Sequence, residues 1–204
     1  MRETKVGLIP VSGKPYHAGH HSLVTTAAAE NDKVILFVST SNRMRKGEFP
    51  IYGKDMKRIW AEELEPIMPG NVEIQYGGSP VRKVYQVIEE ACASGREDQV
   101  FTIYSDPQDT VQNYPQDARD RYMEPMCSIG KVIFAAEENP EKFTRGQGTP
   151  DVSGGKLSHY LETNNFERFA SFMPPNVDAQ NIFDILRAHL SENVIRDFVF
   201  AVLK

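Results

Sequence analysis

The pattern of hydrophobic and polar positions divides the chain into short apolar runs and longer amphipathic stretches. Apolar runs bounded by polar or turn residues predict five strands, at residues 5–9, 33–39, 72–76, 100–104 and 131–136. Apolar positions at helical spacing predict helices between them, one of which covers residues 52–67. Strands that alternate with helices indicate βαβ units with right-handed crossovers. The sequence therefore predicts an α/β fold with a doubly wound, Rossmann-like parallel sheet of five strands in the order 3-2-1-4-5.

Three stretches are less regular. Residues 107–126 are polar, and we expect a loop there with one helix near residues 118–123. Residues 139–151 are rich in glycine, proline and basic residues, which predicts a flexible basic loop. We expect a first domain at residues 1–162 and a helical C-terminal extension at 163–204, packed on the same domain. The extension is expected to end in two short helices, the last with apolar positions that include Val194 and Phe198. The apolar tail also leaves a contact in a homo-oligomer open.

Composition narrows the choice of partners. A formal net charge of −5 gives no general surface for nucleic acid or for an anionic membrane, so neither partner is expected. The two cysteines do not make a disulfide framework, and we expect a reducing cytoplasm. No spacing of histidine, cysteine or acidic residues indicates a metal bound by the protein itself.

Residues 10–20 connect the first predicted strand to a helix. The first backbone N–H groups of a helix are unpaired and its N-terminus is electropositive, so this junction suits a phosphate group. His17 and His20 lie three residues apart on that first turn, and Gly19 leaves the backbone bare. The alternative is a surface turn that carries two histidines. The polar loop at residues 40–47 ends the second strand on the same edge, and Arg43 is a candidate phosphate ligand there.

The stretch Ser12-Gly13-Lys14-Pro15-Tyr16-His17-Ala18-Gly19-His20 resembles the first signature of the HxGH nucleotidyltransferase superfamily. It is similar in particular to the form found in nicotinamide-mononucleotide adenylyltransferases and their viral relatives. Ser12 stands where the family often has Arg, and Gly13-Lys14 replaces Phe-Gln or Phe-Asp. The His-x-Gly-His core is intact.

Residues 152–158 resemble the second signature, Ile-Ser-[Ser/Gly/Ala]-Thr-x-[Ile/Leu]-Arg. From the sequence, Ser153 is expected to cap a helix whose start is bare at Gly154. Gly155 replaces the family's Thr, and Ser158 replaces the Arg that normally holds the triphosphate. If the protein is active, another cation has to take that place. The candidates are Arg145, Lys142 and His159, and we expect Ser158→Arg to leave activity intact or raise it.

The resemblance implies a nucleotidyltransferase that transfers a nucleoside monophosphate, AMP from ATP, to a phosphate-bearing acceptor such as nicotinamide mononucleotide, with release of pyrophosphate. Mg²⁺ would be bound through the triphosphate. One alternative is a cytidylyltransferase that acts on a phosphorylated alcohol or sugar. The departures at Gly155 and Ser158 favour a second alternative, a catalytically weak nucleotide-binding protein with a role in regulation or assembly.

The candidate site residues follow from the two signatures and from the strand ends. By resemblance the catalytic residues are His17, His20, Lys14 and Lys156. The nucleotide-binding residues are Ser12, Gly13, Gly19, Asp106, Ser153, Gly154 and Arg145, and Arg43 is assigned to the acceptor. Asp106 follows the fourth strand, where it would either orient the base or ribose or cap the next turn.

Overall fold

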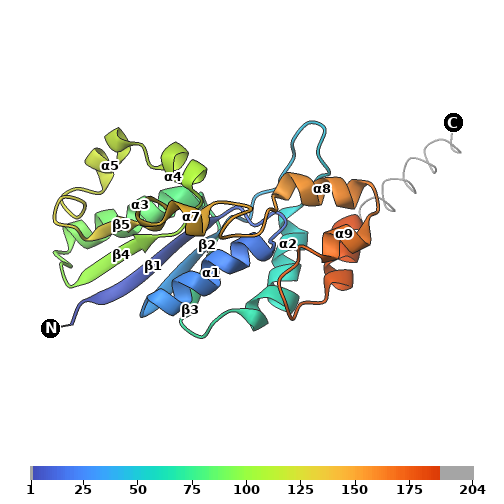
Figure 1. The fold of residues 1–204 in the computed structure, drawn as a ribbon, viewed down its shortest axis with the longest axis horizontal. Helices are drawn as coiled ribbons and strands as arrows, with labels where there is room; N and C mark the ends of the chain where they lie inside the picture. Colours follow the sequence, from blue (N-terminus) through green and yellow to red (C-terminus); the bar gives the residue numbers. More distant parts are fainter. Residues whose placement is uncertain (1, 189–204) are drawn as a thin grey trace, which may run out of the picture.

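A five-stranded parallel sheet forms the centre of the computed structural model, which describes residues 2–188 (Figure 1). The strands are β1 (Thr4–Val11), β2 (Lys33–Val38), β3 (Val72–Tyr76), β4 (Gln99–Ile103) and β5 (Val132–Phe134). Their order is β3-β2-β1-β4-β5 and every neighbouring pair is parallel. The predicted fold class and strand order are confirmed. The order reverses between β1 and β4, where an open α/β sheet leaves a crevice for ligands.

Side chains alternate between the two faces of the central strands. On β1, Ile9 and Val11 belong to one hydrophobic cluster, whereas Val6 and Leu8 belong to the other. β2 divides in the same way, and its five apolar residues are all almost fully buried. A strand that is buried on both faces has to be apolar at consecutive positions, which is why β2 is the clearest strand in the sequence.

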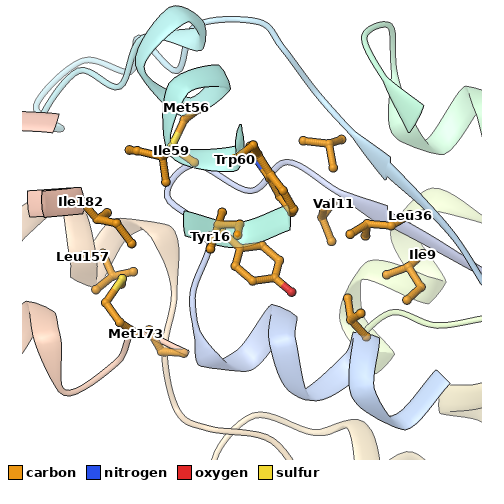
Figure 2. Packing of buried hydrophobic residues seen from close by; sticks show 14 of the residues in the cluster. Ile9, Val11, Tyr16, Leu36, Met56, Ile59, Trp60, Leu157, Met173 and Ile182 are labelled. Carbon is orange, nitrogen blue, oxygen red and sulfur yellow. The ribbon is translucent and has the colours of Figure 1, made fainter. Parts of the chain in front are cut away.

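Helices cover both faces. The first cluster includes residues of α1 (Ala18–Glu30), α2 (Gly53–Ile59), α6 (Ala135–Glu138), α7 (Pro140–Phe143), α8 (Gly154–Glu162) and α9 (Phe166–Ala170). The second cluster packs α3 (Pro80–Ala93) against the other face, with α4 (Pro107–Asn113) and α5 (Gln116–Tyr122) nearby. Figure 2 shows part of the first cluster, where the Tyr16 ring packs edge-on against the Trp60 ring at 4.9 Å between centroids.

Several predicted boundaries are wrong. The helix expected over residues 52–67 is three consecutive pieces: α2, a π-helical turn η1 (Trp60–Leu64) and a 3-10 turn η2 (Glu65–Ile67) that includes Pro66. The fifth strand ends at Phe134, because Ala135 and Ala136 already begin α6. Residues 107–126 contain two helices rather than one.

The basic loop at residues 139–151 is more ordered than the sequence suggests. Asn139 caps α7 by accepting from the backbone N–H of Lys142, and Pro140 takes the first helical position. An isolated bridge joins Arg145 to Thr149. The side chain of Lys142 pairs with Glu30, at the end of α1. The segment therefore contains a short helix and a bridge where the sequence predicts only a loop.

The described part of the C-terminal segment packs on the same core as α1 and α2. Phe169, Met173 and Ile182 belong to the first hydrophobic cluster. The carbonyl of Phe172 accepts a hydrogen bond of 2.8 Å from the backbone N–H of Ala18, at the start of α1. Glu63 accepts from the Asn181 amide at 2.7 Å and from the Asp178 backbone N–H at 2.9 Å. The apolar positions that we expected in the last helix, including Val194 and Phe198, lie outside the described residues. Among residues 2–188, no helix is long and apolar enough to cross a membrane.

Candidate active site

A cavity of about 430 Å³ opens at the carboxyl ends of β1 and β4, between the starts of α1 and α8. Both sequence signatures meet here, since His20 and Ser153 line the same space. The candidate residues that line it are Ser12, Gly13, Lys14, His17, Gly19, His20, Arg43, Asp106, Arg145, Ser153 and Gly154. The site predicted from two segments more than a hundred residues apart is therefore a single cavity.

The two histidines of the first signature form a stacked pair. Their ring centroids are 3.7 Å apart with an angle of 14° between the planes. His17 precedes α1 as its cap, and its Nδ1 accepts a hydrogen bond of 3.3 Å from the backbone N–H of His20. A neutral His17 therefore carries its proton on Nε2, where it can be donated to a ligand. A Cβ on Gly19 would lie 3.1 Å from the His17 ring, so the glycine makes room for the ring itself.

Both rings are neutral at ordinary pH. Burial lowers the pKa of His17 to about 3, and the positive charge of Arg145 acts in the same direction. Burial, the neighbouring His17 and Arg145 hold the pKa of His20 well below its usual range. Nδ1 of His20 is buried and has no hydrogen-bond partner among the described residues. Neutral, partly desolvated imidazoles are suited to donating hydrogen bonds to charge that develops on a bound ligand.

Lys14 is a buried cation without a carboxylate partner among the described contacts. The residue is 3% exposed, and its ammonium donates to the hydroxyls of Ser39 at 2.8 Å and Ser41 at 3.1 Å. Burial lowers the pKa of Lys14, and the neighbouring Arg43 lowers it further. Hydroxyls satisfy the hydrogen bonds but cannot offset the charge. An ammonium that is desolvated in this way is stabilised by an anionic ligand.

The second signature forms the opposite wall of the cavity. Ser153 caps α8 through a bond of 3.3 Å from the backbone N–H of Lys156, as predicted. Gly154 and Gly155 line the cavity. Ser158 is 1% exposed, and its hydroxyl has no partner among the described residues. Position 158, which corresponds to the Arg of the resembled signature, is therefore buried and does not open into the cavity.

Asp106 and Arg145 form an ion pair in the cavity wall. Asp106 also caps α4, by accepting from the backbone N–H of Asp109 at 2.8 Å. Of the two roles left open by the sequence, the structure shows the cap. A second carboxylate, Asp109, lies 3.5 Å from Arg145, and burial together with Asp106 raises the pKa of Asp109.

Three basic residues named from the sequence do not line this cavity. Lys156, expected to be catalytic, pairs instead with Asp151 at 2.7 Å. Lys142 pairs with Glu30, and His159 lies further along α8. Of the candidates for the missing Arg, only Arg145 lines the cavity.

Arg45, from the basic loop at residues 40–47, also lines the cavity, together with two charged residues that sequence reasoning missed: Glu48 and Asp109. Glu48 accepts from Nε and Nη2 of Arg43, at 2.8 and 2.6 Å. A signal was present, because Arg45 and Glu48 lie in or beside the polar loop after the second strand, at the ligand-binding edge of the sheet.

Residues 2–188 contain no group of three or more histidine, cysteine or acidic side chains that could hold a metal ion. The carboxylates that line the cavity are those of Glu48, Asp106 and Asp109, and each of them interacts with an arginine. Mg²⁺ prefers oxygen ligands and often reaches proteins through substrate phosphates and water. The donors present therefore suit Mg²⁺ that enters as part of a nucleotide complex.

The comparisons with known proteins agree with this fold. Residues 1–76 match the sequence model of the pantoate–β-alanine ligase family. Among solved structures, the chain is similar to a provisionally assigned nicotinate-nucleotide adenylyltransferase from Vibrio parahaemolyticus, with 11% sequence identity and a TM-score of 0.51. That match covers 92% of this chain and 96% of the other. A search of curated proteins gave no match. At this identity the structural match shows the fold. The match of the family model over residues 1–76 supports the resemblance to the nucleotidyltransferase superfamily.

Proposed function

We propose that this protein is a nucleotidyltransferase that transfers AMP from ATP to a phosphate-bearing acceptor such as nicotinamide mononucleotide, with release of pyrophosphate. The observation that carries the proposal is the cavity in which the stacked His17 and His20 rings face the start of α8, beside the buried ammonium of Lys14. This arrangement offers neutral donors, a positive charge and bare helix N–H groups to one polyanion.

In the proposed reaction, an oxygen of the acceptor phosphate attacks the α-phosphorus. The bond from that phosphorus to the bridging oxygen breaks, and pyrophosphate leaves with the electron pair. A phosphate nucleophile is already deprotonated near neutral pH, so no general base is needed. Catalysis then rests on positioning and on stabilising the charge that develops. His17 and His20 donate hydrogen bonds to the triphosphate, and Lys14 offsets its charge.

A second candidate comes from the match to the pantoate–β-alanine ligase family, which covers the strand, loop and helix of the first signature. In that case pantoate and β-alanine, rather than a phosphorylated acceptor, would be the partners of ATP. The cytidylyltransferase alternative differs in the base of the triphosphate and in the acceptor, which would be a phosphorylated alcohol or sugar.

One screen tests these proposals together. Pyrophosphate release is measured with Mg²⁺ and ATP or CTP, each with nicotinamide mononucleotide, nicotinate mononucleotide, a phosphorylated alcohol, a sugar phosphate, or pantoate with β-alanine. Release with ATP and a mononucleotide supports the proposal. Release only with CTP, or only with pantoate and β-alanine, replaces it with the corresponding alternative. Triphosphate binding without release under any condition favours the non-catalytic nucleotide-binding protein.

A further inference from the structure

The loop after β2 holds Arg43 in a fixed place. Arg43 and Ile51 form an antiparallel bridge, with hydrogen bonds of 2.8 and 3.0 Å between their backbones. The Arg43 side chain is 14% exposed and reaches the start of α8. A Cβ on Gly154 would lie 2.8 Å from Nη1 of Arg43 and 2.9 Å from the Lys14 carbonyl. The guanidinium therefore uses the space that any other residue at position 154 would fill.

The carboxylate of Glu48 also lies at the start of α8, where it pairs with Arg43. Both Nε and Nη2 of Arg43 donate to Oε2 of Glu48, and Oε1 lies 3.8 Å from Arg45. A Cβ on Gly155 would lie 3.9 Å from Oε1 of Glu48. The carboxylate thus lies beside the first turn of α8, where unpaired N–H groups and the helix dipole favour negative charge. This is the position that suits a phosphate group.

Positive charge exceeds negative charge in this half of the cavity. Lys14, Arg43 and Arg45 line it together with Glu48, whereas Asp106 and Asp109 interact with Arg145 across the cavity. Lys14 is 97% buried and binds only hydroxyls among its described contacts. A single carboxylate cannot offset three cations. The ligand that completes this half therefore carries more than one negative charge, as a diphosphate group does.

We propose that Glu48 occupies the position of a phosphate group of the nucleoside triphosphate, and that Arg43 binds this phosphate when Glu48 is displaced. The inference rests on the proposed function and moves Arg43 from the acceptor to the triphosphate. Glu48 holds Arg43 in its binding conformation before the nucleotide arrives. It also competes with the nucleotide, because two anions cannot share one guanidinium and one helix start without repulsion.

The test is equilibrium binding of pyrophosphate and of Mg²⁺-ATP, measured by calorimetry on the full chain. Glu48→Gln removes the competing charge at nearly constant size, and we expect both ligands to bind about tenfold more tightly. Arg43→Gln should weaken both by about tenfold or more. Glu62→Gln is the matched control, because Glu62 pairs with Arg58 on an exposed face of the α2–η1 helix and should change neither affinity.

Two results would overturn the inference. In the first, the Glu48→Gln variant binds pyrophosphate no more tightly than the wild type does, and Glu48→Asp, which keeps the charge, has the same affinity as both. The other is Arg43→Gln that leaves both ligands unaffected and weakens only nicotinamide mononucleotide. A thermal melt of each variant shows whether it is folded, and Glu48→Ala replaces Glu48→Gln if the latter is not. Because binding is measured without turnover, a failure of the transferase reaction leaves this result independent.

Discussion

Two helix starts face each other across the cavity, and they present different chemistry. At the start of α1, the N–H of Ala18 donates to Phe172 and the N–H of His20 donates to His17. Among the described bonds, only the N–H of Gly19 in that turn has no partner. The start of α1 therefore acts mainly through imidazole side chains. Phosphate can contact it where the histidines donate.

The first two residues of α8, Gly154 and Gly155, have no side chains. The N–H groups of Gly154 and Gly155 have no partner among the described bonds, and neither glycine has a side chain of its own to cover them. The cation at this end comes from another element, since Arg43 belongs to the loop after β2. The start of α8 can therefore hold an anion through its backbone, because its first residues have no side chains and their N–H groups are not already used. The first N–H groups of α1 are mostly occupied.

The largest effect is expected from His20→Ala, which removes an imidazole from the start of α1. If α1 acts through its imidazoles, the variant should lose about 100- to 1000-fold in kcat with a smaller change in KM, because the donor acts on charge in the transition state. Steady-state pyrophosphate release measures this. His21→Ala is the control, since His21 neighbours His20 and also contacts Tyr16 but does not line the cavity. Equal losses in both variants would show a structural role instead.

Ser158→Arg tests whether α8 can regain a side-chain cation. Because Ser158 is 1% exposed, the larger side chain overfills a packed space and buries a charge. We now expect a loss of about 3 kcal/mol in unfolding free energy by urea denaturation. This replaces the expectation from sequence that Ser158→Arg would leave activity intact or raise it. Ser158→Ala should be neutral or slightly stabilising, because it removes a buried hydroxyl without a partner among the described residues.

Acid is expected to destabilise the protein through the two histidines at the start of α1, which has no counterpart at the start of α8. The unfolded chain protonates His17 near pH 6.5, whereas the folded protein keeps it neutral down to about pH 3. Unfolding therefore takes up a proton between these values, so stability is complete above about pH 6.5 and falls as the pH drops. From pH 6.5 to pH 5 the loss from His17 is about 2 kcal/mol, and His20 adds to it in the same direction. Urea denaturation at a series of pH values measures the slope, which should become shallower in His17→Gln.

Among these predictions, the smallest effect is expected from Arg145→Ala. It removes the cation that lines the cavity beside Asp106, and we expect turnover to fall by at least about tenfold, or about 1.4 kcal/mol. Lys142→Ala is matched to it, because both cations lie in residues 139–151 but Lys142 pairs with Glu30 away from this cavity. If the two variants have equal activity, Arg145 is only a structural partner of Asp106.

The sheet could be predicted because its evidence is local. Each buried strand is an apolar run, and the crossover rules then leave few topologies. The meeting of His20 with Ser153 followed from that topology, since the carboxyl ends of parallel strands share an edge. The short helix α7 could also have been found, because Asn139-Pro140 is a capping residue followed by the residue favoured at the first helical position.

The charged partners could not be predicted. Arg145 pairs with Asp106 across 39 residues, and Lys142 with Glu30 across 112. Such pairs depend on where loops lie after folding, which no spacing encodes. Lys156 shows the same limit, since its position in the signature is variable and the turn before α8 provides Asp151 as a nearer partner.

The hydrogen bond from Ala18 to Phe172 has a consequence for the order of events during synthesis. The start of α1 emerges from the ribosome well before Phe172, whose carbonyl accepts a hydrogen bond from the first turn of that helix. Contacts between distant positions form late, because the closing loop is long. We expect a nascent chain that stops before Phe172 to have the sheet but not a finished nucleotide pocket. The growing polypeptide would then be unable to capture nucleotide until Phe172 has also been synthesised and has reached the start of α1.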